Sequence, residues 1–295
     1  MSVVTDEDIR SIVDIRATRP ERIAELAASR TQPKGYVGST GRMLLVAADH
    51  PARGALRVGD NPVAMGDRAD LLDRMVRALR RPGVDGVLGT ADVIDDLLLL
   101  GALDDKVVIG SMNRGGLAGT VFEIDDRFTG FNADSIAGAG YQGGKMLFRI
   151  DPRDSATPAT MQACADAVQS LAERGLMAMV EPFLSGRDGD NLMRNDLSTE
   201  AVVRSATVAA GLATTSAYTW LKLPVVENME AVLAATTLPV VLLGGEVSSD
   251  QDAQFAAWSK ALASPMVRGM VVGRSLLYPP DGNVEAAVDA TVEML

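Results

Sequence analysis

Cysteine and histidine are nearly absent from this chain, which has one of each in 295 residues. Cys164 has no partner for a disulfide within the chain, and it lies in alanine-rich sequence typical of a helix. A zinc centre of the usual kind needs several His or Cys ligands, so His50 alone does not provide one. The sequence therefore predicts neither a disulfide framework nor a metal centre.

Basic residues are also scarce, because 28 Lys and Arg stand against 39 Asp and Glu, for a net charge of −11. Nucleic-acid grooves and sites on anionic membranes need a basic face, so we expect neither partner. No apolar run approaches the roughly 18 residues of a membrane span, and residues 6–10 resemble no signal peptide. We therefore expect a cytoplasmic protein in which any anionic substrate meets a local cluster of cations.

Low-complexity segments and internal repeats are absent as well. Hydrophobic residues make up 47% of the chain and charged residues 23%, which is ordinary for a globular protein with a sizeable core. The length permits two domains, but single α/β barrels commonly reach about 250 residues, with insertions beyond that. One large domain is therefore allowed.

The first forty residues have helical patterns. Thr5 is a candidate cap, Ile9 and Ile12 recur at helical spacing, and Pro20 begins a second helical segment. We expect residues 1–40 to form an N-terminal helical extension that covers one end of the main domain. A packing or oligomer contact without chemistry is the other interpretation, and we expect a homo-oligomer.

Eight short apolar segments, each followed by a helical pattern, occupy residues 41–295. The first of them, residues 43–50, is continuously apolar before it ends in polar groups, as expected of a parallel strand buried on both faces. This alternation predicts a (β/α)8 barrel, a TIM barrel, with a doubly wound open sheet as the alternative. The remaining expected strands are residues 84–89, 106–110, 144–150, 176–182, 218–223, 238–243 and 269–273.

The sixth expected strand carries a lysine among apolar residues. Side chains alternate between the two faces of a strand, so Lys222 shares a face with Trp220, while Leu221 and Leu223 point the other way. Burial lowers the pKa of a lysine, and a neutral amine can attack a carbonyl carbon. Lys222 is thus a candidate Schiff-base lysine. The alternatives are a lysine that extends to solvent from a strand end or one held in an ion pair.

Active sites of such barrels lie at the C-terminal ends of the strands. The polar groups expected there are Asp49 and His50 on the first strand, Lys145 and Arg149 on the fourth, and Glu181 on the fifth. On the fourth strand the alternate positions Met146, Phe148 and Ile150 are apolar and suit the helix layer, so Lys145 and Arg149 should face the lumen.

These groups form a coherent set for imine chemistry. A neighbouring cation such as Lys145 favours the neutral amine that attack on a ketone requires, and Glu181 or Asp49 can then move protons. The iminium is the electron sink, so the reaction calls for no metal or cofactor. A structural ion pair with a lumen lysine is an equally open interpretation for either carboxylate. His50 either contacts substrate or is a hydrogen-bonded structural residue.

Glycine turns follow the last two expected strands, as Gly244-Gly245-Glu246 and Gly273-Arg274. Glycine lets backbone N–H groups approach an anion, and an arginine offers bidentate hydrogen bonds. Phosphate sites recur at this place in the fold, so the pair predicts phosphate binding. Further polar residues lie in loops expected at the same end, and spacing assigns them no role: Arg53, Asn113, Arg114 and Arg127.

The order of these motifs resembles the class I aldolase superfamily, which includes the deoxyribose-phosphate, archaeal-type fructose-bisphosphate and tagatose-bisphosphate aldolases. The resemblance spans residues 43–277, and its specificity comes from the order of short motifs on successive strands. The motifs are AADH at 47–50, GKML at 144–147, VEP at 180–182, WLKLP at 220–224, LGG at 243–245 and VGR at 272–274.

The resemblance implies a function for each matching position. It implies that Lys222 forms the Schiff base, that Glu181 is the acid/base as in the tagatose-bisphosphate enzymes, and that Lys145 is the second lumen lysine. It further implies that the phosphate ligands are Gly245, Gly273 and Arg274.

One departure concerns the substrate. Residues 51–54 read PARG after His50, whereas fructose-bisphosphate members more often have glycine directly after the histidine. The chain resembles a branch associated with sugar or inositol breakdown, which makes a phosphorylated 2-deoxy-5-keto-gluconate (5-dehydro-2-deoxyphosphogluconate) a candidate. The expected activity is a metal-independent lyase that cleaves a phosphorylated ketose or keto sugar acid. A transaldolase with the same imine and a non-catalytic sugar-phosphate-binding barrel are the alternatives.

Overall fold

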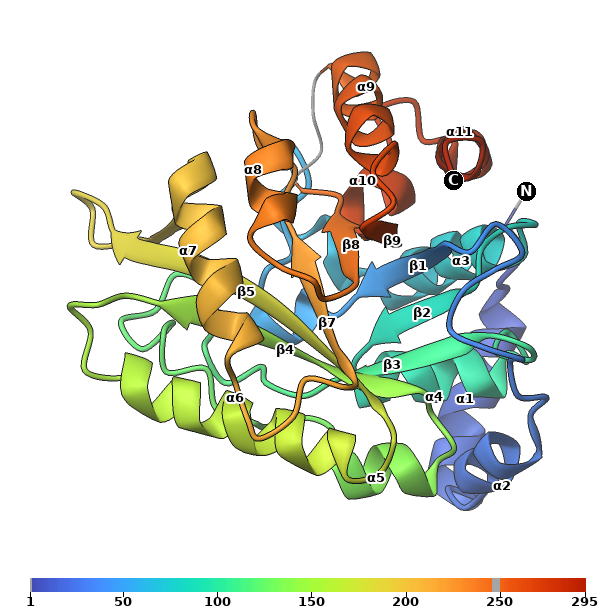
Figure 1. The fold of residues 1–295 in the computed structure, drawn as a ribbon. Helices are drawn as coiled ribbons and strands as arrows, with labels where there is room; N and C mark the ends of the chain where they lie inside the picture. The colour runs from blue at the N-terminus through green and yellow to red at the C-terminus, as the bar shows by residue number, and fades with distance from the viewer. Residues whose placement is uncertain (1, 246–249) are drawn as a thin grey trace.

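The computed structural model describes residues 2–245 and 250–295. Eight parallel strands of this described part form a closed barrel, because β9 pairs with β1 and β4 pairs with β5 (Figure 1). The predicted TIM barrel is confirmed, and closure excludes the open sheet. Around the barrel the strands are β1 Met43–Ala48, β2 Gly86–Gly89, β3 Val107–Ser111, β4 Gly143–Ile150, β5 Met177–Arg187, β7 Thr219–Leu223, β8 Val240–Leu243 and β9 Val267–Val272.

Helices surround the strands (Figure 1). Local sequence sets several of their starts: Thr5 forms a capping box with Asp8, and the Ser198 side chain accepts from the N–H of Ala201. No helix in the described residues is long and apolar enough to cross a membrane. The helices are α1 Asp6–Thr18, α2 Arg22–Ser29, α3 Arg68–Leu79, α4 Ala91–Leu99, α5 Ala133–Gly138, α6 Thr157–Ala172, α7 Thr199–Ala210, α8 Met229–Ala234, α9 Gln251–Leu262, α10 Arg274–Leu277 and α11 Val284–Val292, with 3-10 turns at Pro51–Arg53 and Ala64–Gly66.

Apolar side chains form two layers, one inside the barrel and one between the strands and the helices. Met179 and Val241 belong to the inner layer, and Trp220 packs against it. Leu221 and Leu223 belong to the outer layer, so the alternation expected along this strand is confirmed. The inner layer fills the barrel interior beside the charged side chains of β4, β5 and β7.

The N-terminal helices pack beside α4, where Arg16 NH2 lies 2.8 Å from Asp96 Oδ1. The segment that follows them, residues 30–42, runs across the N-terminal ends of the strands. There Arg30 donates to the carbonyl oxygen of Lys106 at 2.8 Å, and the Tyr36 hydroxyl donates to that of Gly175 at 3.4 Å. This segment of the extension therefore contacts the N-terminal end of the barrel. The proposed division of the chain at residue 40 stays a prediction.

One hairpin was not expected from the sequence. The sequence predicts a strand end at Pro182, but β5 continues to Arg187 and pairs antiparallel with β6, Met193–Asn195. Pro182 is accommodated within the strand, opposite Phe148 of β4. The hairpin turn includes Asn191, which has a left-handed φ of 61°.

Candidate active site

Two lysines and a glutamate from neighbouring strands meet in the barrel lumen. One carboxylate oxygen of Glu181 on β5 lies 2.5 Å from Lys222 Nζ on β7, and the other lies 2.5 Å from Lys145 Nζ on β4. All three side chains are buried. The structure therefore brings together three of the residues that the sequence singled out, and Lys222 is ion-paired inside the lumen.

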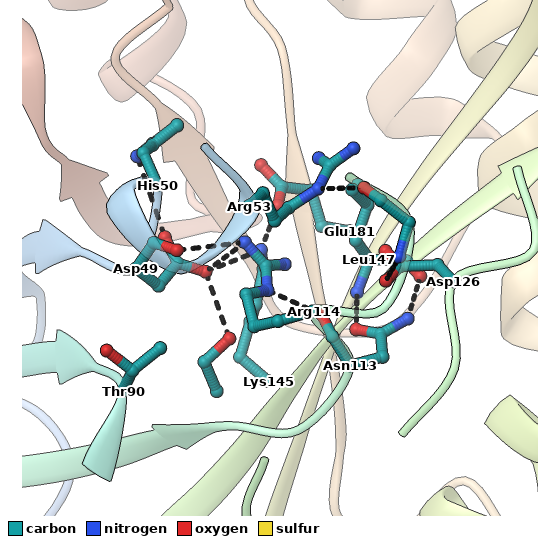
Figure 2. A network of polar contacts seen from close by, with 12 residues as sticks. Asp49, His50, Arg53, Thr90, Asn113, Arg114, Asp126, Lys145, Leu147 and Glu181 are labelled. Carbon is teal, nitrogen blue, oxygen red and sulfur yellow. Dashed lines mark hydrogen bonds and ion pairs between the residues drawn. The ribbon is translucent and has the colours of Figure 1, made fainter. Parts of the chain in front are cut away.

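Asp49 continues this network from the end of β1. Its Oδ2 atom lies 3.1 Å from Lys145 Nζ and 3.1 Å from Arg114 NH1, and it accepts a hydrogen bond from the Ser111 hydroxyl at 3.1 Å (Figure 2). With an exposure of 1%, Asp49 is nearly closed off from solvent. Lys145 therefore bridges the two carboxylates of the site, Asp49 and Glu181.

The close ion pairs set the protonation of the carboxyls. Burial opposes ionisation of Asp49 and Glu181, but the neighbouring cations, led by Lys145, hold the pKa of both carboxyls well below the usual value. Burial lowers the pKa of Lys145, and the attraction of Asp49 and Glu181 limits this fall. At neutral pH both carboxylates are therefore ionised.

His50 lies at the rim of the same site. Its Nδ1 atom is 3.6 Å from Asp49 Oδ1 and has no hydrogen-bond partner among the described residues, while the side chain is 32% exposed. Burial lowers the pKa of His50 to about 3, with Arg274 and Lys222 adding to the fall and Asp49 opposing it. The imidazole is therefore neutral at physiological pH. The hydrogen bond expected of a structural histidine is not formed by Nδ1.

The glycine turns lie side by side, because β8 and β9 are neighbours in the barrel. Gly245 has a left-handed φ of 72°, and a Cβ on Gly273 would come within 2.8 Å of the Ala47 carbonyl oxygen, so both positions suit glycine. The Ser275 hydroxyl donates to the Gly244 carbonyl oxygen at 3.3 Å, which ties the two turns together. Arg274 NH1 donates to the carbonyl oxygen of Arg57 at 3.3 Å. Glu246 lies outside the described residues.

Arg149 does not contact the two lysines. It lies four residues beyond Lys145 on β4, roughly 13 Å along the strand at about 3.3 Å per residue. Its NH2 group is 3.0 Å from Glu123 Oε1, an atom to which Arg53 NH2 also donates at 3.0 Å. Arg149 therefore lies in a second, neighbouring cluster of buried charges, and its binding role stays a prediction.

Several residues of this region have no role that spacing in the sequence assigns. Asn113 and Arg114 lie two and three residues after the end of β3, so the same rule of polar strand ends could have selected them. Asn113 fastens this loop to β4, because its side chain donates to the Leu147 carbonyl oxygen at 2.6 Å and accepts from the Leu147 N–H at 2.8 Å (Figure 2). Arg127 is 74% exposed and pairs locally with Asp125.

Two buried acids of the loop after β3 carry no comparable sequence signal. Glu123 holds Arg53 and Arg149, and Asp126 Oδ1 accepts from the N–H of Gly116 at 3.0 Å. Burial raises the pKa of Asp126. Within the described part of the chain, no group of three or more His, Cys, Asp or Glu is arranged to hold a metal ion.

The arrangement supplies the parts that amine attack on a carbonyl needs. Lys222 provides the nitrogen, Glu181 is a proton acceptor at hydrogen-bond distance from it, and Lys145 is a cation between the two carboxylates. The backbone N–H groups of the glycine turns after β8 and β9, and the Arg274 guanidinium, lie at another part of the same rim.

Comparisons with known proteins place this geometry in context. A family model described as Cgl0159-like matches residues 41–292. The crystal structure of Cgl0159 from Corynebacterium glutamicum is 51% identical in sequence, with a TM-score of 0.96, and the match covers 100% of this chain and 98% of that chain. A search of curated proteins finds no match.

More distant structures share the barrel. An archaeal fructose 1,6-bisphosphate aldolase is 17% identical, with a TM-score of 0.63, over 92% of this chain and 98% of that chain. An archaeal fructose-1,6-bisphosphate aldolase whose catalytic Lys is covalently bound to the carbinolamine intermediate of the substrate is also 17% identical, with a TM-score of 0.66 and the same coverage. The expected likeness to Schiff-base-forming aldolases is thus confirmed for the fold.

Proposed function

The chain belongs to the Cgl0159-like family, and we propose that it is a class I aldolase that cleaves a phosphorylated ketose or keto sugar acid through an imine on Lys222. The observation that carries the proposal is the buried contact of Lys222 Nζ with Glu181, 2.5 Å away, with a second lysine on the other oxygen of that carboxylate. The covalently bound lysine of the archaeal aldolase supports the proposal by analogy of fold.

The proposed reaction begins when Lys222 Nζ, once it has given its proton to Glu181, attacks the ketone carbon. The resulting carbinolamine loses water and becomes a protonated imine. A carboxylate, Glu181 or Asp49, then removes the proton of the hydroxyl on the carbon β to the imine. The carbon–carbon bond breaks, an aldehyde leaves, and the bond electrons pass to the iminium to form an enamine. Protonation and hydrolysis of the enamine release the ketone product and return Lys222.

Phosphate binding is assigned to the adjoining turns of β8 and β9. Gly245 and Gly273 allow close approach of backbone N–H groups, and Arg274 adds a cation at the same rim. The buried carbonyl oxygen of Gly244 holds the two turns together by accepting the hydrogen bond of Ser275. The neutral His50 at the same rim is a candidate ligand for a substrate hydroxyl. A 2-deoxy-5-keto-gluconate that carries a phosphate is the candidate substrate.

Borohydride trapping tests the proposal. The protein is incubated with dihydroxyacetone phosphate, reduced, digested and analysed by mass spectrometry. We expect a stable secondary amine on the peptide that contains Lys222, none in Lys222→Met, and an unchanged adduct in Lys260→Met, which removes an exposed lysine of α9. An adduct on another peptide, or none in the wild-type protein, would refute the assignment.

Product analysis separates the alternatives. An aldolase releases the aldehyde and ketone fragments without an added acceptor, whereas a transaldolase turns over only when an acceptor aldehyde is present. Binding of dihydroxyacetone phosphate without any reducible imine would instead favour a non-catalytic sugar-phosphate-binding barrel. The expected homo-oligomer is a separate prediction, which sedimentation equilibrium of the full chain tests.

A further inference from the structure

Arg114 has a buried donor group without an acceptor. Its NH1 group lies 3.1 Å from Asp49 Oδ2, its Nε donates to the carbonyl oxygen of Asn113, and its NH2 group is buried and has no hydrogen-bond partner among the described residues. The side chain as a whole is 6% exposed. A buried charged donor without an acceptor is costly, so this group marks a place for an oxygen ligand.

The charges of the region point to the same ligand. In the described residues, the close ion pairs of Lys145, Lys222 and Arg114 are with the carboxylates of Asp49 and Glu181. Arg114 also attracts the Asp126 carboxylate. The adjoining cluster contains two cations, Arg53 and Arg149, and two carboxyl groups, Glu123 and Asp126, so its charges balance when both carboxyls are ionised. Burial raises the pKa of Asp126. The two clusters therefore contain one more cation than carboxylate. A buried charge without a counter-charge is unfavourable, and a bound anion would remove that penalty.

The position of Arg114 in the barrel separates it from the glycine turns. Arg114 follows β3, and the order of strands around the barrel places β3 opposite β8, and β4 opposite β9. Lys222 is on β7, midway between β4 and β9. A molecule that reacts at Lys222 with a phosphate at the β8 and β9 turns would thus extend its other end toward Arg114.

We propose that Arg114 binds a second anionic group of the substrate, a carboxylate or a phosphate, at the end of the carbon chain remote from the phosphate at the glycine turns. The planar guanidinium matches the oxygens of both groups. This makes Arg114 a specificity-determining residue for a substrate with an anion at each end. The inference rests on the function proposed above.

The experiment runs the reaction in the condensation direction. Dihydroxyacetone phosphate is the donor, and the acceptor aldehydes are succinate semialdehyde, glyceraldehyde 3-phosphate and the neutral butanal. We expect the wild-type protein to favour at least one anionic acceptor over butanal by about thirtyfold in kcat/KM, which corresponds to about 2 kcal/mol at about 1.4 kcal/mol per factor of ten. The preferred anion identifies the group as carboxylate or phosphate.

Two variants complete the test. In Arg114→Gln the ratio of kcat/KM for anionic and neutral acceptors should fall close to one. Asp49 also loses an ion-pair partner in this variant, but the resulting loss of activity affects both kinds of acceptor and cancels in the ratio. Arg127→Gln removes the exposed arginine of the same loop and should keep the wild-type ratio. Arg114→Lys keeps the positive charge but lacks the planar guanidinium with its paired N–H donors, so it should give an intermediate ratio.

The outcomes distinguish the two proposals. Condensation without a preference for either anionic acceptor, or an unchanged ratio in a folded Arg114→Gln, would overturn the role of Arg114 alone. If Arg114→Gln does not fold, the ratios of the wild-type protein and of Arg114→Lys still decide the matter. No condensation with any aldehyde and no reducible imine would remove the proposed function, and this inference with it.

Discussion

Glu181→Gln is the most informative single change in the lumen, because glutamine keeps the shape of the side chain and removes its charge. In the native protein each carboxylate oxygen lies 2.5 Å from a lysine Nζ. After the substitution Lys145 keeps Asp49 at 3.1 Å, but Lys222 loses the one carboxylate with which it forms an ion pair in the described residues. The perturbation is therefore one orphaned, buried ammonium group.

Removal of one partner from a buried ion pair costs about 3–5 kcal/mol. We therefore expect Glu181→Gln to lower the free energy of unfolding by about 3–5 kcal/mol at pH 7.

Chemical denaturation of four proteins measures this effect: wild type, Glu181→Gln, Lys222→Met and the double variant. The double variant removes both charges, so its loss should be smaller than the sum of the single losses by at least about 2 kcal/mol, within the usual range of coupling between residues in contact. The pKa of Glu181 is lower in the folded than in the unfolded state. The stabilisation by its charge should therefore be constant from pH 6 to 8 and decrease below about pH 4.3. A loss under about 1 kcal/mol in Glu181→Gln, or additive single losses, would refute the buried ion pairs.

Three further predictions follow from other parts of the chain. Because the pKa of His50 is lowered to about 3, the signal of this single imidazole should not titrate between pH 5 and 8 in NMR spectra. The unfolded chain binds the extra proton, so His50 should make stability rise with pH from about 3 to about 6.5, and a titration near pH 6.5 would contradict the lowered pKa. Gly245→Ala should lower stability by about 1 kcal/mol because of its φ of 72°, and it should weaken the thermal protection that inorganic phosphate gives. The control Gly101→Ala has a φ of 64° but lies outside the site, so it should lower stability without affecting that protection. Burial raises the pKa of the Cys164 thiol, so a thiol reagent should modify it only in denaturant, and rapid modification of the native protein would contradict its burial.

The barrel and the faces of its strands could be predicted because their causes are local. Alternation along a strand places Lys222 on the same face as Trp220, and the apolar alternate positions of β4 place Lys145 toward the lumen. Prediction failed where pairing between strands outweighed the local preference of a residue. Pro182 suggested the end of a strand, but pairing with the long β4 carries β5 through it to the hairpin with β6.

Which polar residue types end the strands can be recognised from the chain alone, because short periodic patterns and polar strand ends need no knowledge of spatial neighbours. How these groups pair depends on the folded molecule. Glu181 lies between two lysines because barrel closure brings β4, β5 and β7 together. Arg114 reaches Asp49, 65 positions away in the chain, because β1 and β3 both end at the same rim. Pairing over such separations depends on closure and loop packing, which no local pattern encodes.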